Sequence, residues 1–423
     1  MTQDNASSVT VGGEHLVSAA RFNIKPLMAV YMTCTMAMMA FVSLIGPIAR
    51  SLRLAPWQAG AVVTVGGVLW MLLSRPWGAL SDRRGRRTVL LAGVGGFMLA
   101  YWAMCALLIV SLRVLPSAGL VFAGLLVSRG AVGAFFSAIP AAGQALVADH
   151  VAPGERAGAM ASLGAANGVG LVVGPAIAAA LVQYGLDLPL YVTAALPLLA
   201  IGILWHQLPR NERISDTASA ALGLGDARLR RPMIVAFAAM FSVAIGQITV
   251  GFFAIDQLQL KPEPAARASS LALTLVGVGL IVAQLIVHKL HWSPQRLIRI
   301  GALVSAAGFG AVSLVSTQWA LMACFFFAAA GMGWVFPAFS AMAANAVQPH
   351  EQGAAAGSVG AAQGLGIVLG PLAGSLLYEL GPGIPYLLVG TLLVLVALWT
   401  SEMCPTEVTP WNTSDQPGYS DRL

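Results

Sequence analysis

The sequence predicts an all-α membrane protein with twelve transmembrane helices in two six-helix, pseudo-symmetric bundles. Composition is the first reason: 58% of the 423 residues are hydrophobic and only 9% are charged, which is unusual for a soluble domain. The second reason is a series of twelve apolar runs, each close to the roughly 20 residues that a helix needs to cross a bilayer. The third reason is an internal repeat that divides the chain into two halves.

Each apolar run is expected to be a helix, because a helix satisfies its own backbone hydrogen bonds in lipid. The first six runs cover residues 26–49, 57–79, 88–112, 117–146, 157–182 and 188–207. The last six cover residues 232–256, 268–290, 297–316, 318–346, 352–379 and 383–402. The predicted parts are an N-terminal tail (1–25), an N-terminal bundle (26–207), a linker (208–231), a C-terminal bundle (232–402) and a C-terminal tail (403–423).

The distribution of basic residues predicts the orientation of the chain. If the N-terminus lies inside, 16 Lys and Arg residues fall on inside segments and 5 on outside loops, as the positive-inside rule requires. No signal peptide is evident at the start of the chain. We therefore expect a multi-pass protein of the plasma membrane, the bacterial inner membrane, with cytoplasmic tails and linker.

The internal repeat lies in the fifth and eleventh runs. Residues 153–175 align with residues 349–371 without a gap, at an offset of 196 residues. Glycines four residues apart form flat surfaces that let another helix approach, and the prolines allow a bend. These surfaces either serve packing alone or also move and seal during transport, and we favour the second interpretation. The repeated residues are Gly164, Gly168, Gly170, Gly174 and Pro175, with their counterparts Gly360, Gly364, Gly366, Gly370 and Pro371.

Three motifs resemble those of the major facilitator superfamily. The stretch GALSDRRGRR at 78–87 resembles the signature loop between the second and third spans. GVGLVVGP at 168–175 resembles the antiporter motif of drug/proton exporters, and SRGAVGAF at 128–135 resembles a third motif. With twelve spans in two halves, the resemblance covers nearly the whole chain, and tetracycline and multidrug exporters are the most similar subgroup. It implies transport by alternating access between the two halves.

The charged loop has two interpretations. Positive-inside anchoring explains the arginines but neither the aspartate nor the glycines. The resemblance instead implies a conformational latch, in which Asp82 contacts the N-terminal end of the 352–379 run in the outward-open state and Asp149 pairs with the loop arginines. We favour the latch, which is expected to be one-sided because the equivalent loop of the second half has no aspartate. Its residues are Gly78, Asp82, Arg83, Gly85, Arg86, Arg87 and Asp149.

Arg129 is the candidate for proton coupling. It lies near the middle of the 117–146 run, where an ionisable side chain is costly and indicates function. The resemblance implicates this arginine in coupling, and a structural arginine bonded to backbone carbonyls is the alternative. A buried carboxylate that could load a proton is absent from the first run, while Asp256 and Glu379 are better interpreted as interfacial. Proton coupling is therefore an expectation from the resemblance.

Uncharged polar groups and aromatic rings within the spans predict a substrate site. Such a lining suits a small amphiphilic molecule, and Arg129 also leaves room for an anionic or siderophore-like substrate. The candidate substrate-binding residues are Gln144, Asn167, Gln247, Phe252, Trp334 and Gln363.

The predicted function is proton-coupled efflux of a small amphiphilic molecule. The alternatives are a proton-coupled importer of a nutrient or metal–siderophore complex, and a non-transporting membrane sensor. The sequence contains neither a phosphate-binding loop nor a His-Glu-x-x-His pattern, and its four cysteines have no metal or redox spacing. We therefore expect no enzyme activity, cofactor or metal site. The expected partners are a small-molecule substrate, protons and the lipid bilayer, without nucleic acid; the sequence does not determine the oligomeric state, for which we expect a monomer.

Overall fold

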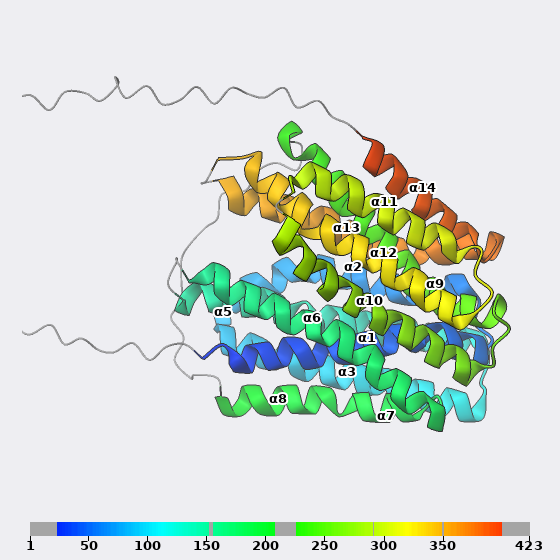
Figure 1. Cartoon of the computed structure of the whole chain (residues 1–423). Coiled ribbons are helices and arrows are strands. Elements are labelled where there is room, and N and C mark those ends of the chain that lie inside the picture. The colour runs from blue at the N-terminus through cyan, green and yellow to red at the C-terminus, as the bar shows by residue number, and fades with distance from the viewer. Residues whose placement is uncertain (1–22, 152–154, 208–225, 291, 349–350, 400–423) are drawn as a thin grey trace, which may run out of the picture.

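A computed structural model describes residues 23–151, 155–207, 226–290, 292–348 and 351–399. Within these residues the regular structure is entirely helical, which confirms the predicted fold class. Figure 1 shows two groups of roughly aligned helices, one from the first half of the chain and one from the second.

The helices follow the predicted apolar runs closely. The first bundle contains α1 (Lys25–Ser51), α2 (Pro56–Arg84), α3 (Arg86–Val114), α4 (Ala118–Phe136), α5 (Ala138–His150), α6 (Arg156–Leu181), the 3-10 turn η1 (Val182–Tyr184), α7 (Leu188–Ala194) and α8 (Leu196–Gln207). The second contains the 3-10 turn η2 (Ala227–Leu229), α9 (Arg230–Asp256), α10 (Pro262–Leu290), α11 (Pro294–Val312), α12 (Gln318–Asn345), α13 (Gln352–Leu380) and α14 (Ile384–Leu398).

The described helices are long and apolar enough for a multi-pass membrane protein. In the described part of the chain, ten segments meet the length and hydropathy expected of a membrane span. The other two predicted spans correspond to α11, which has 19 residues, and α14, which has 15. Each of the twelve predicted spans therefore coincides with a helical segment.

Two predicted spans are interrupted, and proline explains both breaks. The 117–146 run divides into α4 and α5 at Ser137, because Pro140 has no N–H to donate to the carbonyl of Phe136. The 188–207 run divides into α7 and α8 near Ala195, two residues before Pro197. The apolar pattern of both runs continues across the break, so the pattern alone predicted single helices.

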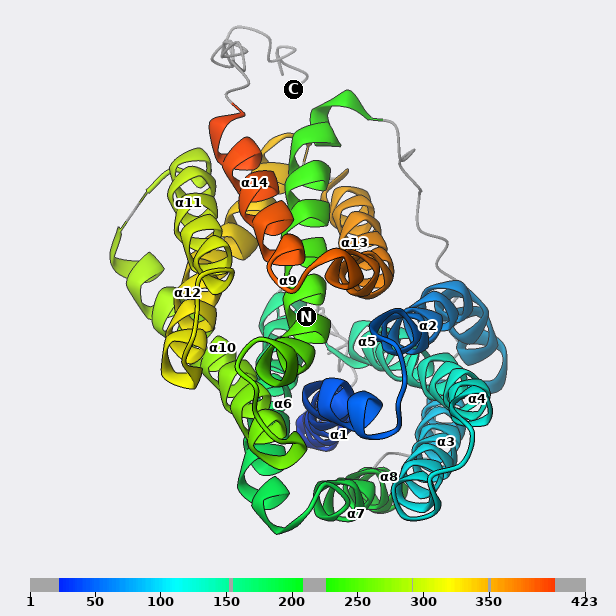
Figure 2. The ribbon, with the colours of Figure 1, turned by 90° about the vertical axis from the view of Figure 1, so that its right-hand side faces the viewer.

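Packing is similar in the two bundles. Helix α6 packs on α1 as α13 packs on α9, and the bundles meet where α2 packs on α13 and α6 on α10. Figure 2 looks along the helices and shows these pairs side by side. We call the end where α1 begins and α14 ends the tail end, and the end where α1 and α9 finish and α2 begins the far end.

Candidate functional site

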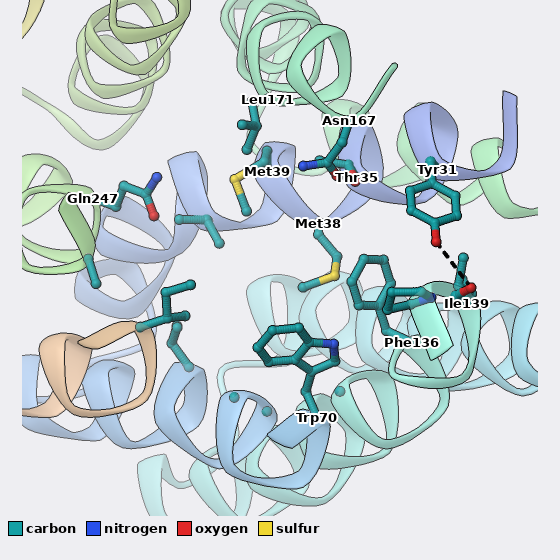
Figure 3. Close-up of a pocket in the computed structure, with 18 of the residues that line it drawn as sticks. Tyr31, Thr35, Met38, Met39, Trp70, Phe136, Ile139, Asn167, Leu171 and Gln247 are labelled. Carbon is teal, nitrogen blue, oxygen red and sulfur yellow. Dashed lines mark hydrogen bonds between the residues drawn. The ribbon is translucent and has the colours of Figure 1, made fainter. Parts of the chain in front are cut away.

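A cavity of about 490 Å³ lies between the two bundles. Its walls come from α1, α2, α4, α5 and α6 of the first bundle and from α9 and α13 of the second. The volume lies within the range of small-molecule sites, and most of the lining side chains are apolar. Figure 3 shows side chains that project into this space from several helices.

One face of α1 forms a wall of the cavity. Tyr31, Thr35, Met38, Met39 and Val42 line it, at the spacing that places residues on a single helical face. The Thr35 hydroxyl donates to Asn167 Oδ1 at 2.6 Å and the Tyr31 hydroxyl donates to the Ile139 carbonyl at 3.4 Å. These bonds join α1 to α6 and α5, so the wall is held by its neighbours (Figure 3).

The opposite wall carries a guanidinium and an indole. Arg129 on α4 is 4% exposed, and its Nε and Nη1 atoms are buried without a hydrogen-bond partner. Its guanidinium carbon lies 5.8 Å from the centre of the Phe41 ring, a cation–π contact. Trp70 on α2 also lines the cavity, and its buried Nε1 atom has no hydrogen-bond partner. Among the cavity-lining residues, only Arg129 carries a formal charge at neutral pH.

The structure brings together half of the predicted substrate-binding residues. Gln144, Asn167 and Gln247 line the cavity. Phe252, Trp334 and Gln363 are not among its lining residues. Phe252 is fully buried at the far end, and the Trp334 indole donates to the Ala283 carbonyl at 3.1 Å within the second bundle.

The sequence interpretation missed Tyr31 and Thr35. Both are separated from Met38 and Met39 by helical intervals, so the 3.6-residue period connects them once one of the four is known to face the cavity. Without that reference, all faces of an apolar membrane helix look alike. The helical period of α1 could therefore have identified Tyr31 and Thr35 only if one cavity-facing residue of this helix had been known.

Small residues close the far end of the cavity. Gly46 of α1 and Gly251 of α9 approach so closely that a Cβ on Gly46 would lie 2.9 Å from the Gly251 Cα. The Ser269 hydroxyl on α10 donates to the Ser43 carbonyl at 2.9 Å, and the Ser270 hydroxyl lies 3.0 Å from the Ser43 hydroxyl. The two bundles are thus in direct backbone and hydroxyl contact at this end.

Charged groups reinforce the same contact. Arg50 Nη2 on α1 lies 2.5 Å from Asp256 Oδ2 on α9, and the Tyr378 hydroxyl on α13 donates to the same oxygen at 3.1 Å. Glu379 Oε1 accepts from the Trp57 backbone N–H at 3.3 Å, at the first turn of α2. We call Arg50, Asp256 and Tyr378 the far-end cluster. It joins the two bundles across their interface.

The charged loop forms a separate cluster at the tail end. Arg86 donates from Nε to Asp149 Oδ2 at 2.9 Å and from Nη1 to Ser81 Oγ at 3.2 Å, and it also pairs with Asp82. The Arg86 and Asp149 side chains are 8% and 10% exposed, whereas Asp82 is 52% exposed. Gly85 has a φ of 91°, a backbone conformation that glycine adopts readily, so it allows the tight turn between α2 and α3.

The other loop residues are more peripheral. Arg87 Nη2 donates to the Trp205 carbonyl at 3.1 Å, which fixes the loop to α8. Arg83 is exposed, and a Cβ on Gly78 would meet no atom within 4 Å. The structure thus joins Asp82, Arg86 and Asp149 within the first bundle.

A second ionic cluster lies at the tail end of the other bundle. Arg228 pairs with Asp226 at 2.7 Å and with Glu351 at 2.9 Å, linking η2 to the start of α13. Hydrogen bonds from Arg228 hold the pKa of the Asp226 carboxylate below its ordinary value.

The repeated glycines divide into two kinds. Gly170 and Gly174 press against the backbone of α1, and their counterparts Gly366 and Gly370 press against α9. A Cβ on Gly164, Gly168 or Gly360 would meet nothing within 4 Å, and one on Gly364 only the edge of the Trp70 ring at 4.0 Å. One pair of each repeat is therefore a packing face, whereas the other pair lies open in this structure. Pro175 and Pro371 both lie inside their helices, and Pro371 also lines the cavity.

No cluster of three or more His, Cys, Asp or Glu side chains suited to a metal ion occurs in the described ranges of the chain. Cys34 and Cys105 are buried free thiols and Cys324 is half-buried, while Cys404 lies outside the described residues.

Comparisons with known proteins give a consistent result. The sequence model described as the Major Facilitator Superfamily matches residues 27–291 and 263–417. The human protein Solute carrier family 67 member A1 is 29% identical over 392 residues, which covers 85% of this chain and 88% of that protein. Tetracycline resistance protein, class G, of Vibrio anguillarum is 26% identical over 359 residues, covering 80% and 86%. The crystal structure of a bacterial homolog to the human lysosomal transporter Spinster has the same fold, with a TM-score of 0.67, 14% identity and coverage of 88% and 93%.

Proposed function

The chain belongs to the Major Facilitator Superfamily, and on that premise we propose that it exports a small amphiphilic molecule from the cytoplasm in exchange for protons. Family membership confirms the resemblance to the superfamily, and with it a multi-pass membrane transporter. The observation that carries the proposal is the largely apolar cavity at the interface of the two bundles, which is where duplicated transporters bind substrate.

The positions of the contacts between the bundles support alternating access. With the tails in the cytoplasm of a bacterial cell, the far end faces outward, and the contacts of Ser43, Gly46 and Arg50 close it. The state described here is then inward-facing. We propose that the open glycines Gly164, Gly168, Gly360 and Gly364 receive the opposite bundle when the tail end closes, whereas Gly170, Gly174, Gly366 and Gly370 keep their packing role.

The charged loop is proposed as the latch of the outward-facing state. In the inward-facing state Asp82 pairs with Arg86 on its own bundle, which leaves the buried Arg86–Asp149 pair as the fixed base of the latch. When the tail end closes, Asp82 would exchange part of this contact for the start of α13. A carboxylate at a helix N-terminus contributes about 0.3–1 kcal/mol at an exposed site, which suits a reversible contact.

Arg129 is the proposed coupling residue, through its positive charge and not through its own proton. A guanidinium stays protonated at every physiological pH, so a carboxylate must carry the exchanged proton. Asp256 and Glu379 both lie at the interface of the bundles at the far end, where loading a proton would weaken the contact with the first bundle. Export is favoured over import because relatives with 24–26% identity are named tetracycline resistance proteins.

Uptake into inverted membrane vesicles tests the proposal. Tetracycline, ethidium and a ferric siderophore are offered with and without a proton gradient, and vesicles without the protein give the background. Export predicts gradient-driven accumulation that Arg129→Ala abolishes and Asp82→Asn slows. Entry of substrate into right-side-out vesicles instead, with no accumulation in inverted ones, would identify an importer. Absence of protein-dependent movement in both would favour a sensor.

A further inference from the structure

Three hydrogen-bond donor atoms, from two side chains in the cavity wall, have no partner. Nε and Nη1 of Arg129 and Nε1 of Trp70 are all buried, and the structure gives them no acceptor. The two side chains line the same cavity from neighbouring positions, because the Arg129 guanidinium packs against Gly66 and Trp70 follows one helical turn after Gly66 on α2. Buried donors normally have acceptors, so two such side chains in the lining of one cavity indicate where an acceptor from outside the chain would bind.

The charge of the cavity is also unbalanced. Its lining contains no aspartate, glutamate, lysine or histidine, so Arg129 contributes one uncompensated positive charge. The cation–π contact with Phe41 compensates this charge only in part, because an aromatic ring attracts a guanidinium far less than a carboxylate does. A buried charge without a counter-ion is costly, and an anion that entered the cavity would remove this cost.

We propose that the cavity selects organic anions: amphiphilic molecules whose carboxylate or sulfonate accepts hydrogen bonds from Arg129 and Trp70. The apolar part of the anion would lie against Met38, Met39 and Phe136, which line the same space (Figure 3). This inference rests on the proposed export function and specifies its substrate class. It also means that a permanently cationic drug is disfavoured, since no acid in the lining would balance it.

The size and lining of the cavity favour an organic over an inorganic anion. A volume of about 490 Å³ is much larger than a small inorganic ion needs. The methionine and aromatic side chains of the lining would also offer such an ion no polar contacts to replace its hydration shell. Asn167 and Gln247 lie on other walls and offer uncharged groups to a second polar part of the molecule (Figure 3). The property that all substrates are expected to share is therefore an anionic group that binds Arg129.

A matched pair of probes tests the charge directly. 1-Anilinonaphthalene-8-sulfonate and N-phenyl-1-naphthylamine share one ring system and differ in the sulfonate. Binding of each to the full chain in lipid nanodiscs is measured by calorimetry, and empty nanodiscs are subtracted. The wild type is expected to bind the sulfonate more tightly. Arg129→Gln should weaken sulfonate binding on the order of 10- to 100-fold, as expected for loss of a hydrogen bond to a charged group, and leave the neutral probe nearly unchanged.

Two further variants keep the test decisive. Trp70→Phe keeps a ring but removes the N–H, so it should weaken sulfonate binding by about 3- to 10-fold, and it provides a measurement if the Arg129 variant does not fold. Arg113→Gln is the matched control, because this exposed arginine lies outside the cavity. Equal affinity for the two probes, absence of sulfonate binding, or sulfonate binding that survives both cavity substitutions would overturn the proposal.

The same probes separate this inference from the proposed function. Proton-driven accumulation of ethidium or the neutral probe, without Arg129-dependent binding of the sulfonate, would retain export and overturn anion selectivity. Arg129-dependent binding of the sulfonate without proton-driven movement in inverted vesicles would support the anion site and overturn export.

Discussion

The far-end cluster offers a direct test of how the cavity is closed. Asp256→Asn removes the charge that faces Arg50 but retains a side chain of the same size. The pair has a separation of 2.5 Å and side-chain exposures of 33% and 26%, and Asp256 also accepts from Tyr378. A hydrogen bond to a charged group contributes about 1.5–3 kcal/mol, and partial exposure to solvent reduces this to roughly 1–2 kcal/mol. The far end should therefore open roughly 5- to 30-fold more often.

Thiol labelling measures this opening. Ser270 is fully buried at the sealed interface, so Ser270→Cys in a background without the native cysteines reports access from the far end. A membrane-impermeant maleimide is applied to right-side-out vesicles, and its rate is compared with and without Asp256→Asn. The matched control is Asp187→Asn, whose pair with Arg113 at 3.3 Å lies within the first bundle and should leave the rate unchanged.

A double-mutant cycle identifies the cause of any change. Arg50→Gln alone, Asp256→Asn alone and the two together should give nearly the same labelling rate, because each breaks the same contact. Additive effects of the two substitutions, or a labelling rate that Asp256→Asn does not raise, would refute the reasoning that this pair holds the far end closed.

Three further predictions concern packing and the tail-end clusters. Gly174→Ala should destabilise the protein by about 1–3 kcal/mol, because the added methyl group overpacks against α1, and a thermal shift assay should show a lower melting temperature. Gly168→Ala places its methyl group in open space, so the melting temperature of the protein should remain almost unchanged. Asp149→Asn should lower the melting temperature much more than Asp82→Asn, because only the former is a buried partner of the loop arginine; an equal effect of the two would contradict the cluster geometry. The Asp226 carboxylate has a pKa below its ordinary value of 3.8, so its contribution to stability is complete above pH 3.8 and is lost as the pH falls through the folded-state pKa. Carbon-detected NMR should show that Asp226 titrates below pH 3.8 in the wild type but not in an Arg228→Gln variant.

The fold was predictable because its determinants are local. Apolar length identifies each span, and the repeat at an offset of 196 residues identifies the two halves, without knowledge of any contact. The breaks at Ser137 and Ala195 were not predicted, although Pro140 and Pro197 were visible, because prolines often bend membrane helices without ending them.

The cavity was less predictable because it depends on which face of each helix turns inward. Asn167 and Gln247 were found by their polarity, yet Trp334 satisfies its N–H within its own bundle and Phe252 fills the far-end contact. Lipid tails are as apolar as the side chains of neighbouring helices, so an apolar or aromatic residue is compatible with either, and composition alone does not show which residues face the cavity. Only the three-dimensional arrangement separates cavity-lining rings from packing rings.

The positions of the acids constrain how protons could drive the transporter. Tyr31 and Arg129 are the titratable side chains among the lining residues, and neither releases a proton near neutral pH in its ordinary range. The carboxylates that join the bundles in the described residues, Asp256 and Glu379, lie at the far end, away from the substrate wall. Proton antiport in this chain therefore requires that the proton and the substrate act at different places. A proton on Asp256 would release Arg50 and open the far end, while an anion on Arg129 would neutralise the cavity. The two events would be linked only through the movement of one bundle against the other.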